Sequence, residues 1–298
     1  MKSLSLLWSG LFALSFVAHA AGADLVADGA KVEMLSEGYI FTEGPAVDRD
    51  GNVFFTDQPN DRIVKYNAAD GSFSDWLKPA GRSNGTFFDK DGNLLACADE
   101  KNELWSISPD KKVTVLASRV DGKLLNGPND LWIRPDGNLY FTDPLYAREY
   151  WKRDKATQQP GQCVYFFDLK ARKATAVAVD LKQPNGIIGT PDGKTLYVAD
   201  IGARKTYSYS VKLDGALENK TLFCEMGSDG MTIDAEGNVY LTGRGVTVFD
   251  KTGKQLMNIP IPESWTGNVT FAGKDRHLLF ITASKKVYGV KMRVKGAY

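Results

Sequence analysis

One short hydrophobic pattern recurs along the chain: an acidic residue and a glycine, followed by alternating polar and apolar or aromatic residues. An Asp-Gly pair before such an alternation is typical of a tight turn that leads into a β-strand. The copies are DGNVFFTD (50–57), DGNLLACAD (91–99), DGNLYFTD (136–143), DGKTLYVAD (192–200), EGNVYLTG (236–243) and a degenerate sixth, DRHLLFITA (275–283).

The spacing of these copies predicts a propeller. The turn glycines are 39 to 56 residues apart, with Arg276 in the sixth slot, and further strand-like runs such as RIVKYN and FSDWLK lie between them. Repeats of roughly 40 to 45 residues with about four strands each are the signature of propeller blades. The sixth repeat lacks one strand, and GAKVEMLS (29–36) precedes the first. We therefore predict an all-β, six-bladed β-propeller with four-stranded blades, closed by this N-terminal strand on the last blade. Weak helical periodicity disfavours an α/β barrel.

The N-terminus differs from the rest of the chain. Lys2 precedes a mainly apolar stretch from Leu4 to Val17, and Ala18-His19-Ala20 fits a signal peptidase site. The stretch is short for a bilayer span of about 20 residues. We expect a cleaved signal peptide at 1–20 and one propeller domain at 21–298, exported to the periplasm or secreted; an uncleaved anchor is the alternative.

Composition excludes several function classes. The 37 basic and 36 acidic side chains give a net charge of +1, without long blocks of one sign. This balanced charge does not favour nucleic acid as a partner. It also does not favour a membrane surface as a partner of the protein after signal cleavage. The three cysteines, Cys97, Cys163 and Cys224, lie in apolar runs and are expected to be small buried hydrophobes. After signal cleavage only His277 remains, which excludes a Ser-His-Asp triad.

A second set of residues shares the phase of the repeat. A side chain with an oxygen atom lies eight residues before each turn slot. A lone Asn or Asp before Gly is an ordinary turn former. Six in one phase instead predict a ring of oxygens on the inner strands, around the central axis. Two carboxylates and four amides suit a hard divalent cation, and Ca²⁺ rather than Mg²⁺, since a wide cage tolerates flexible coordination. The six are Glu43, Asn84, Asn129, Asn185, Asp229 and Asn268.

The chain resembles the SMP-30, gluconolactonase and luciferin-regenerating-enzyme family. The resemblance covers essentially the whole chain after the predicted signal. It implies a six-bladed propeller with a metal in the central channel and the hydrolysis of a lactone or related ester. The motifs that carry it are FTEGPAVDRDGNVFFTD (41–57), LNGPNDLWIRPDGNLYFTDP (125–144), QPNGIIGTPDGKTLYVAD (183–200) and SDGMTIDAEGNVYLT (228–242).

The resemblance also assigns roles. The family's metal ligands fall on Glu43, Asn185 and Asp229, and Asn129 matches a position at or beside the metal. The family's proposed general base corresponds to Asp229. Asn84 and Asn268 are not among these ligands, and we expect them to line the channel or to contact the substrate. Asn129 can also contact the substrate.

Two departures from the family concern substrate specificity. Gly127 stands where animal members carry a substrate-contacting arginine, and Cys97-Ala98-Asp99-Glu100 replaces the Cys-Glu-His of many bacterial gluconolactonases. The long interval 143–167 is a further difference between repeats. We expect it to form a lid in which Tyr146 and Arg148 contact a polyhydroxylated or acidic substrate. A solvated loop is the alternative.

The expected mechanism uses the cation and one carboxylate. Ca²⁺ would polarise a lactone carbonyl while Asp229 takes a proton from the attacking water. A metal-bound carboxylate is a weak base, so direct attack by Asp229 stays open. Two other functions remain possible for this fold: a related propeller esterase or phosphotriesterase, and a non-enzymatic, metal-stabilised binding propeller. The absence of a histidine pair argues against a paraoxonase-like enzyme.

Overall fold

Each recurring turn joins the first two strands of a four-stranded antiparallel sheet in the computed structural model, which describes residues 25–298. The turn glycines adopt the left-handed backbone that such turns require, as at Gly51 (φ 89°) and Gly237 (φ 88°). Arg276 takes the same conformation, with φ 60°, in the degenerate sixth copy. Its guanidinium donates hydrogen bonds to the backbone carbonyls of Gly273 and Asp48 (2.8 and 2.6 Å), which helps to hold this turn.

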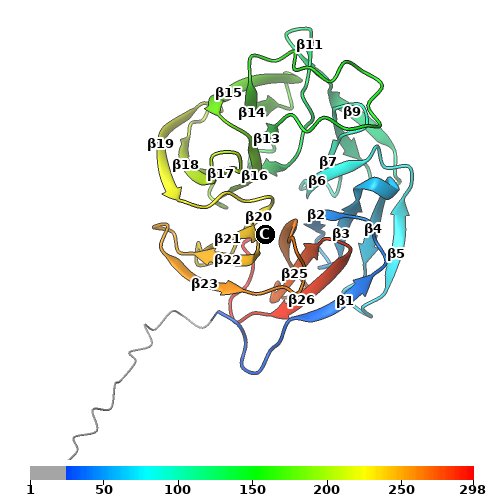
Figure 1. Ribbon diagram of the computed structural model, residues 1–298, viewed down its shortest axis with the longest axis vertical. Helices are drawn as coiled ribbons and strands as arrows, with labels where there is room; N and C mark the ends of the chain where they lie inside the picture. Colours follow the sequence, from blue (N-terminus) through cyan, green and yellow to red (C-terminus); the bar gives the residue numbers. More distant parts are fainter. Residues whose placement is uncertain (1–24) are drawn as a thin grey trace, which may run out of the picture.

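Six such sheets stand around a central axis, as Figure 1 shows. The first strand of each blade is innermost. Blade 1 contains β2 (Thr42–Val47), β3 (Val53–Asp57), β4 (Arg62–Tyr66) and β5 (Phe73–Leu77). Blade 2 contains β6 (Ser83–Phe88), β7 (Leu94–Ala98), β8 (Glu103–Ile107) and β9 (Val113–Ala117). Blade 3 contains β12 (Leu131–Ile133), β13 (Leu139–Asp143), β14 (Gln162–Asp168) and β15 (Lys173–Leu181).

The other three blades repeat this arrangement. Blade 4 contains β16 (Pro184–Gly189), β17 (Thr195–Asp200), β18 (Lys205–Val211) and β19 (Leu217–Cys224). Blade 5 contains β20 (Met231–Ile233), β21 (Val239–Gly243), β22 (Gly245–Phe249) and β23 (Gln255–Ile259). Blade 6 contains β24 (Asn268–Ala272), β25 (Leu278–Ala283), β26 (Lys286–Lys291) and, as its outermost strand, β1 (Glu33–Glu37).

The sixth blade closes the ring as the sequence predicts. β1 pairs antiparallel with β26, with Glu33 opposite Gly289 and Glu37 opposite Lys286. The N-terminal strand thus covers the edge that β26 would otherwise expose. In Figure 1 the blue β1 lies beside the red β26, so strands far apart in the sequence meet in one sheet. The predicted six-bladed, all-β fold is confirmed.

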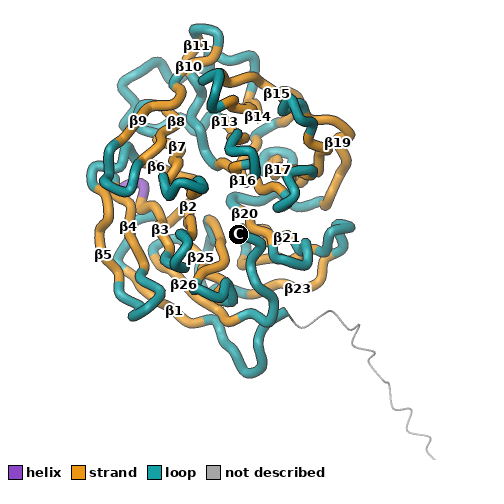
Figure 2. Tube along the Cα trace, turned by 180° about the vertical axis from the view of Figure 1, so that it is seen from behind, coloured by secondary structure: helices purple, strands orange, loops and turns teal. Residues whose placement is uncertain are grey.

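Little regular structure lies outside the blades. A short hairpin pairs β10 (Arg119–Val120) with β11 (Lys123–Leu124), and η1 (Gln58–Asn60) is the one helical turn among the described residues, drawn purple in Figure 2. Within residues 25–298, no helix has the length and apolarity needed to span a bilayer. The predicted signal peptide at 1–20 lies outside the described residues and stays a prediction.

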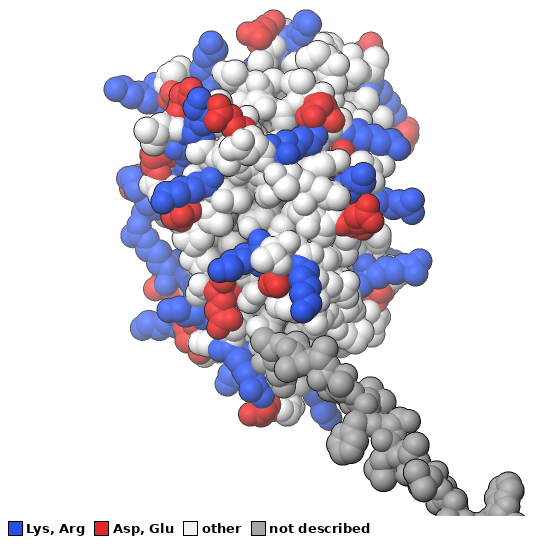
Figure 3. Space-filling view, turned by 90° about the vertical axis from the view of Figure 1, so that its left-hand side faces the viewer, with Lys and Arg blue, Asp and Glu red and all other residues white. Residues whose placement is uncertain are grey.

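The apolar core lies between neighbouring blades, because each sheet packs its faces against the next. Trp132, fully buried, belongs to a cluster that joins blades 3, 4 and 5. Cys97 and Cys163 are buried in the cluster between blades 2 and 3, and Cys224 is buried in that around Trp132. All three are free thiols, as expected. Figure 3 shows basic and acidic side chains interspersed on the face in view, in keeping with the near-zero net charge.

Candidate functional site

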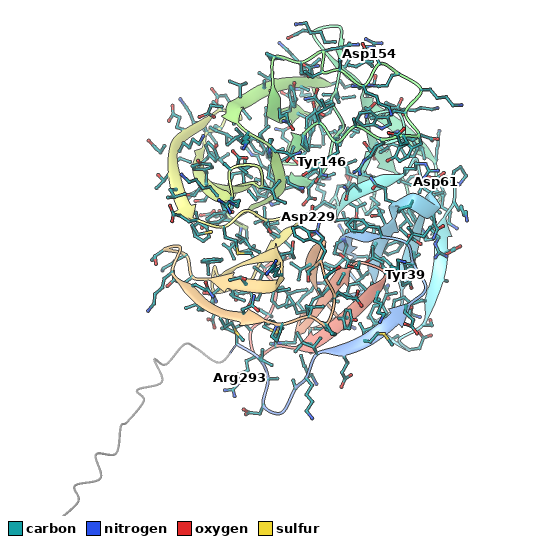
Figure 4. The ribbon with its side chains drawn as sticks, in the orientation of Figure 1. Tyr39, Asp61, Tyr146, Asp154, Asp229 and Arg293 are labelled. Atoms are coloured by element: carbon teal, nitrogen blue, oxygen red, sulfur yellow. The ribbon has the colours of Figure 1, made fainter. Side chains whose placement is uncertain are left out.

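The predicted oxygen ring lies where the six inner strands begin. Four members belong to inner strands themselves, namely Glu43 in β2, Asn84 in β6, Asn185 in β16 and Asn268 in β24. Asn129 and Asp229 lie two residues before β12 and β20. All are buried except Asp229, which is partly exposed. Figure 4 shows Asp229 near the centre of the ring.

Glycines beside the ring residues let the inner strands approach one another closely. A Cβ on Gly44 would lie 1.9 Å from the carbonyl oxygen of Asn84 in the next blade. A Cβ on Gly230 would lie 1.9 Å from Cγ of Asn268. Both distances are far below van der Waals contact, so only glycine fits. The acidic-glycine pair Asp229-Gly230 therefore serves the packing of neighbouring inner strands rather than a hairpin turn.

Threonines of the second strands fix the backbone of the ring. The hydroxyl of Thr56 donates to the carbonyl of Asn84 (3.1 Å), and that of Thr142 donates to the carbonyl of Asn185 (2.8 Å). In each case the hydroxyl lies in one blade and the ring residue in the next. The repeated threonine of FFTD and YFTD thus holds neighbouring ring residues in register.

One side of the ring is a cluster around Asp229. Asn185 donates from Nδ2 to Oδ1 of Asp229 (2.9 Å) and to the hydroxyl of Tyr146 (2.9 Å). Trp265 donates from Nε1 to Oδ2 of Asp229 (2.6 Å). Both carboxylate oxygens of Asp229 are therefore oriented by side chains, and Figure 4 shows Tyr146 and Asp229 close together near the axis.

The other side is a cluster around Glu43. Its Oε2 accepts from the backbone of Gly44 (2.7 Å) and from Nδ2 of Asn268 (3.1 Å). The same Asn268 Nδ2 lies 3.5 Å from Oδ2 of Asp130. Asn268 thus bridges two buried carboxyl groups.

The three acidic groups have raised pKa values because they are buried together. Burial raises the pKa of Glu43 well above its usual range, and the negative charge of Asp229 adds to this rise. Burial raises the pKa of Asp229 to about 6, although hydrogen bonds from Trp265 and Asn185 lower it in part. Burial also raises the pKa of Asp130 to about 8. Such a concentration of carboxyl groups favours a bound cation.

The donor set fits a hard divalent cation. Oδ1 of Asn185 is buried and has no hydrogen-bond partner among the described residues. The amides of Asn84 and Asn129, each almost fully buried, likewise make no side-chain hydrogen bond within residues 25–298. No cluster of three His, Cys, Asp or Glu side chains in that part of the chain could hold a metal alone. Amide oxygens beside two carboxylates are therefore the available ligands, a set that suits Ca²⁺.

Two residues of the site escaped sequence reasoning. Asp130 follows a ring residue, and strand alternation would turn its side chain away from the axis, yet it lies beside Asn268. Trp265 belongs to the loop before β24 and has no counterpart in the repeat. The one signal available for Trp265 was its position three residues before Asn268.

A cavity of about 530 Å³ lies behind the ring, on the side of the turns. Residues of all six inner strands line it, among them Val47, Phe87, Ile188 and Phe271. Asp130 and Asn268 reach this cavity, whereas Glu43 and Asp229 are not part of its lining. The hydroxyl of Tyr298 donates to the carbonyl of Gly189 (2.7 Å) at its far end, and the C-terminus lies near the centre in Figures 1 and 2.

The interval 143–167 contacts the site directly. Tyr146 accepts the hydrogen bond from Asn185 described above, and the guanidinium of Arg148 lies over the Tyr146 ring, 5.5 Å from its centre. Nε of Arg148 donates to Oδ2 of Asp99 (3.0 Å). The predicted contact of Tyr146 and Arg148 with a substrate stays a prediction, but Tyr146 contacts the ring residue Asn185 and Arg148 contacts Tyr146.

Comparisons with known proteins agree with this architecture. A model of the SMP-30/Gluconolactonase/LRE-like region matches residues 41–285. A gluconolactonase of Zymomonas mobilis is 26% identical over 294 residues, with 89% of this chain and 82% of that protein covered. A diisopropyl-fluorophosphatase of Loligo vulgaris is 27% identical, with 80% and 84% covered. The solved structure of a gluconolactonase from Xanthomonas campestris has a TM-score of 0.83 at 28% identity, with 92% and 93% covered. The chain therefore belongs to the SMP-30/gluconolactonase/LRE-like family.

Proposed function

We propose that this protein is a Ca²⁺-dependent lactonase that opens the ring of a sugar lactone or a related lactone. The observation that carries the proposal is the ring itself, in which the carboxylates of Glu43 and Asp229 lie with a buried amide oxygen, Oδ1 of Asn185, that has no partner among the described residues. The gluconolactonase relatives in Zymomonas mobilis and Xanthomonas campestris support lactone hydrolysis. We further propose that the predicted signal sequence exports the enzyme to the periplasm or the medium.

The residues that would hold the cation are Glu43, Asn129, Asn185 and Asp229. A bound Ca²⁺ supplies a Lewis acid that polarises the lactone carbonyl. Asp229 takes the proton from the attacking water, and its donors Asn185 and Trp265 fix the direction of its oxygens. Direct attack by the Asp229 carboxylate on the carbonyl carbon is the alternative chemistry for the same residue.

The test is hydrolysis of D-glucono-1,5-lactone by the purified protein. We expect activity with Ca²⁺, its loss after EDTA, and its return on addition of Ca²⁺. Asn185→Ala should weaken the response to Ca²⁺, because it removes the unpartnered buried oxygen. Asp192→Asn is the matched control, because this acidic side chain is exposed in a turn. Activity that survives EDTA would contradict the role of the cation.

A phosphotriesterase is the second candidate, favoured by the relative in Loligo vulgaris. The same assay with a neutral organophosphate triester distinguishes the two. Hydrolysis of the phosphotriester without any lactone would reverse the order of the candidates. If a panel of lactones and phosphotriesters is inert, a binding propeller becomes the better description.

A further inference from the structure

The last position of the second strand carries an aspartate in three blades, and its role there is structural. The carboxylate there accepts two backbone hydrogen bonds from the loop that leads into its own blade. This satisfies N–H groups that would otherwise lack a partner. The donors are Ile40 and Phe41 for Asp57, Asn126 and Gly127 for Asp143, and Lys182 and Gln183 for Asp200, at 2.8 to 3.3 Å.

In blade 2 this position is Ala98, and the next residue, Asp99, has a different set of partners. Its Oδ2 accepts hydrogen bonds from Nε of Arg148 (3.0 Å) and from the hydroxyl of Tyr150. In the loop that leads into blade 2, the backbone N–H groups of Ala80 and Arg82 donate to the carboxylate of Asp61 instead (2.9 and 2.7 Å). Asp61 lies on the blade 1 side of the ring in Figure 4. Asp99 is therefore free to bind the interval 143–167.

The pairing leaves the outer end of Arg148 available. Asp99 engages Nε, and no described residue accepts a hydrogen bond from either terminal Nη group of Arg148. The side chain is 30% exposed, while that of Asp99 is 6% exposed. A contact chain runs from Asp99 through Arg148 and Tyr146 to Asn185.

A second arginine reinforces the positive charge there. The guanidinium of Arg82 lies over the Tyr150 ring, 4.5 Å from its centre. It donates to the carbonyl of Pro59 (2.8 Å), a neutral group, and forms no ion pair among residues 25–298.

We propose that Asp99 is a positioning residue that holds Arg148 to receive a carboxylate of the substrate. The preferred substrates are then lactones of sugar acids that carry a second, free carboxylate group. The planar fork of an arginine held at Nε offers both Nη groups to such a carboxylate, whereas a neutral hydroxyl would use only part of it. The proposal rests on the proposed lactonase function and names its substrate class.

The experiment compares two lactones that differ at one carbon. D-glucaro-1,4-lactone carries a carboxylate where D-glucono-1,4-lactone carries a hydroxymethyl group, and both are assayed with a constant excess of Ca²⁺. We expect the full-length protein to have a kcat/KM about 10- to 100-fold higher for the acidic lactone, as a charged hydrogen bond would give. High salt should reduce this preference.

Two variants test whether Asp99 and Arg148 cause the preference for the acidic lactone. Arg148→Met should lower kcat/KM for the acidic lactone about 10- to 100-fold and change that for the neutral lactone less than about threefold. Asp99→Asn should raise KM for the acidic lactone and leave kcat nearly unchanged, because it misplaces Arg148 without touching the reacting atoms. Lys152→Met removes an exposed positive charge from the same interval and is the matched control, with no expected effect.

The outcomes separate the two proposals. Equal loss on both lactones in Arg148→Met, or a preference of the wild type for the neutral lactone, would overturn the substrate class while lactonase function stands. Inactivity on both of these lactones and on D-glucono-1,5-lactone would overturn the proposed function, and the substrate class with it. If Asp99→Asn does not fold, the Arg148→Met result still decides the substrate class.

Discussion

Two sets of carboxylates lie at the same end of the propeller, all buried except the partly exposed Asp229, and their partners differ. The outer set, Asp57, Asp143 and Asp200, ends the second strands and accepts backbone N–H groups. The inner set, Glu43 and Asp229, faces the axis and relies mainly on side chains, among them Asn185, Trp265 and Asn268.

The difference shows that burial of an acidic side chain does not by itself mark a functional site. An outer carboxylate completes hydrogen bonds that the fold requires, so its loss should cost stability. An inner carboxylate lies beside another negative charge without a fixed positive partner, so its loss should cost activity. Asp99 combines an outer position with side-chain partners.

The largest effect is expected at Asp229. Asp229→Asn should lower kcat/KM for D-glucono-1,5-lactone by about 10²- to 10⁴-fold, since it removes the proposed base or nucleophile. The melting temperature of the metal-free protein should stay unchanged or rise, because the change removes a buried charge close to Glu43. Steady-state kinetics and thermal unfolding measure the two effects. Unchanged activity would refute the role of Asp229.

Asp200 should show the opposite behaviour. Asp200→Ala leaves the N–H groups of Lys182 and Gln183 without their acceptor, at about 1 to 3 kcal/mol each. Each kcal/mol of lost stability lowers the melting temperature of a somewhat smaller domain by about 2 to 4 °C. The melting temperature of this protein should therefore fall by roughly 5 to 15 °C. The folded fraction should keep its kcat. Asp200→Asn keeps a hydrogen-bond acceptor and should lose less stability than Asp200→Ala. A stable but inactive Asp200→Ala would contradict the comparison.

Asp61 tests whether it, rather than Asp99, has the structural role in blade 2. Asp61→Ala should destabilise by about 1 to 2 kcal/mol, less than Asp200→Ala, because Asp61 is half-buried and water can replace it in part. Asp99→Asn should cost less than about 1 kcal/mol, since no backbone N–H among the described residues depends on the Asp99 carboxylate. Urea titrations compare the two. A larger loss in Asp99→Asn would show that Asp99 has the structural role that Asp57, Asp143 and Asp200 have in the other blades.

The smallest effect is a pH dependence of the metal-free protein. The pKa of Asp229 is raised to about 6 from a usual 3.8, so folding favours its protonated form. Its contribution to stability is present at low pH and is lost as pH rises from about 4 to 6. Asp229→Asn should therefore gain about 2 to 4 °C relative to the wild type at pH 7.5 and little at pH 4.5. The same gain at both pH values would contradict a raised pKa.

The repeat made most of the fold predictable. The turns from Asp50-Gly51 onward set the strand order, and the spacing of their glycines set the number of blades, because each repeat is one supersecondary unit. The ring could be predicted for the same reason, since equivalent positions in equivalent blades share one distance from the axis. Trp265 and Asp130 could not be found in this way, because neither side chain follows from its position in a repeat.

The amino-acid sequence by itself determined the blades, their closure by β1 and which six residues begin the inner strands, because local turn chemistry and strand alternation act within each repeat. Only the tertiary structure decided which of these residues share partners. It joined Asn185 to Asp229 and Tyr146, and it paired Asp99 with Arg148. Contacts between blades depend on the close approach of inner strands and on one irregular interval, 143–167, and no local pattern encodes either.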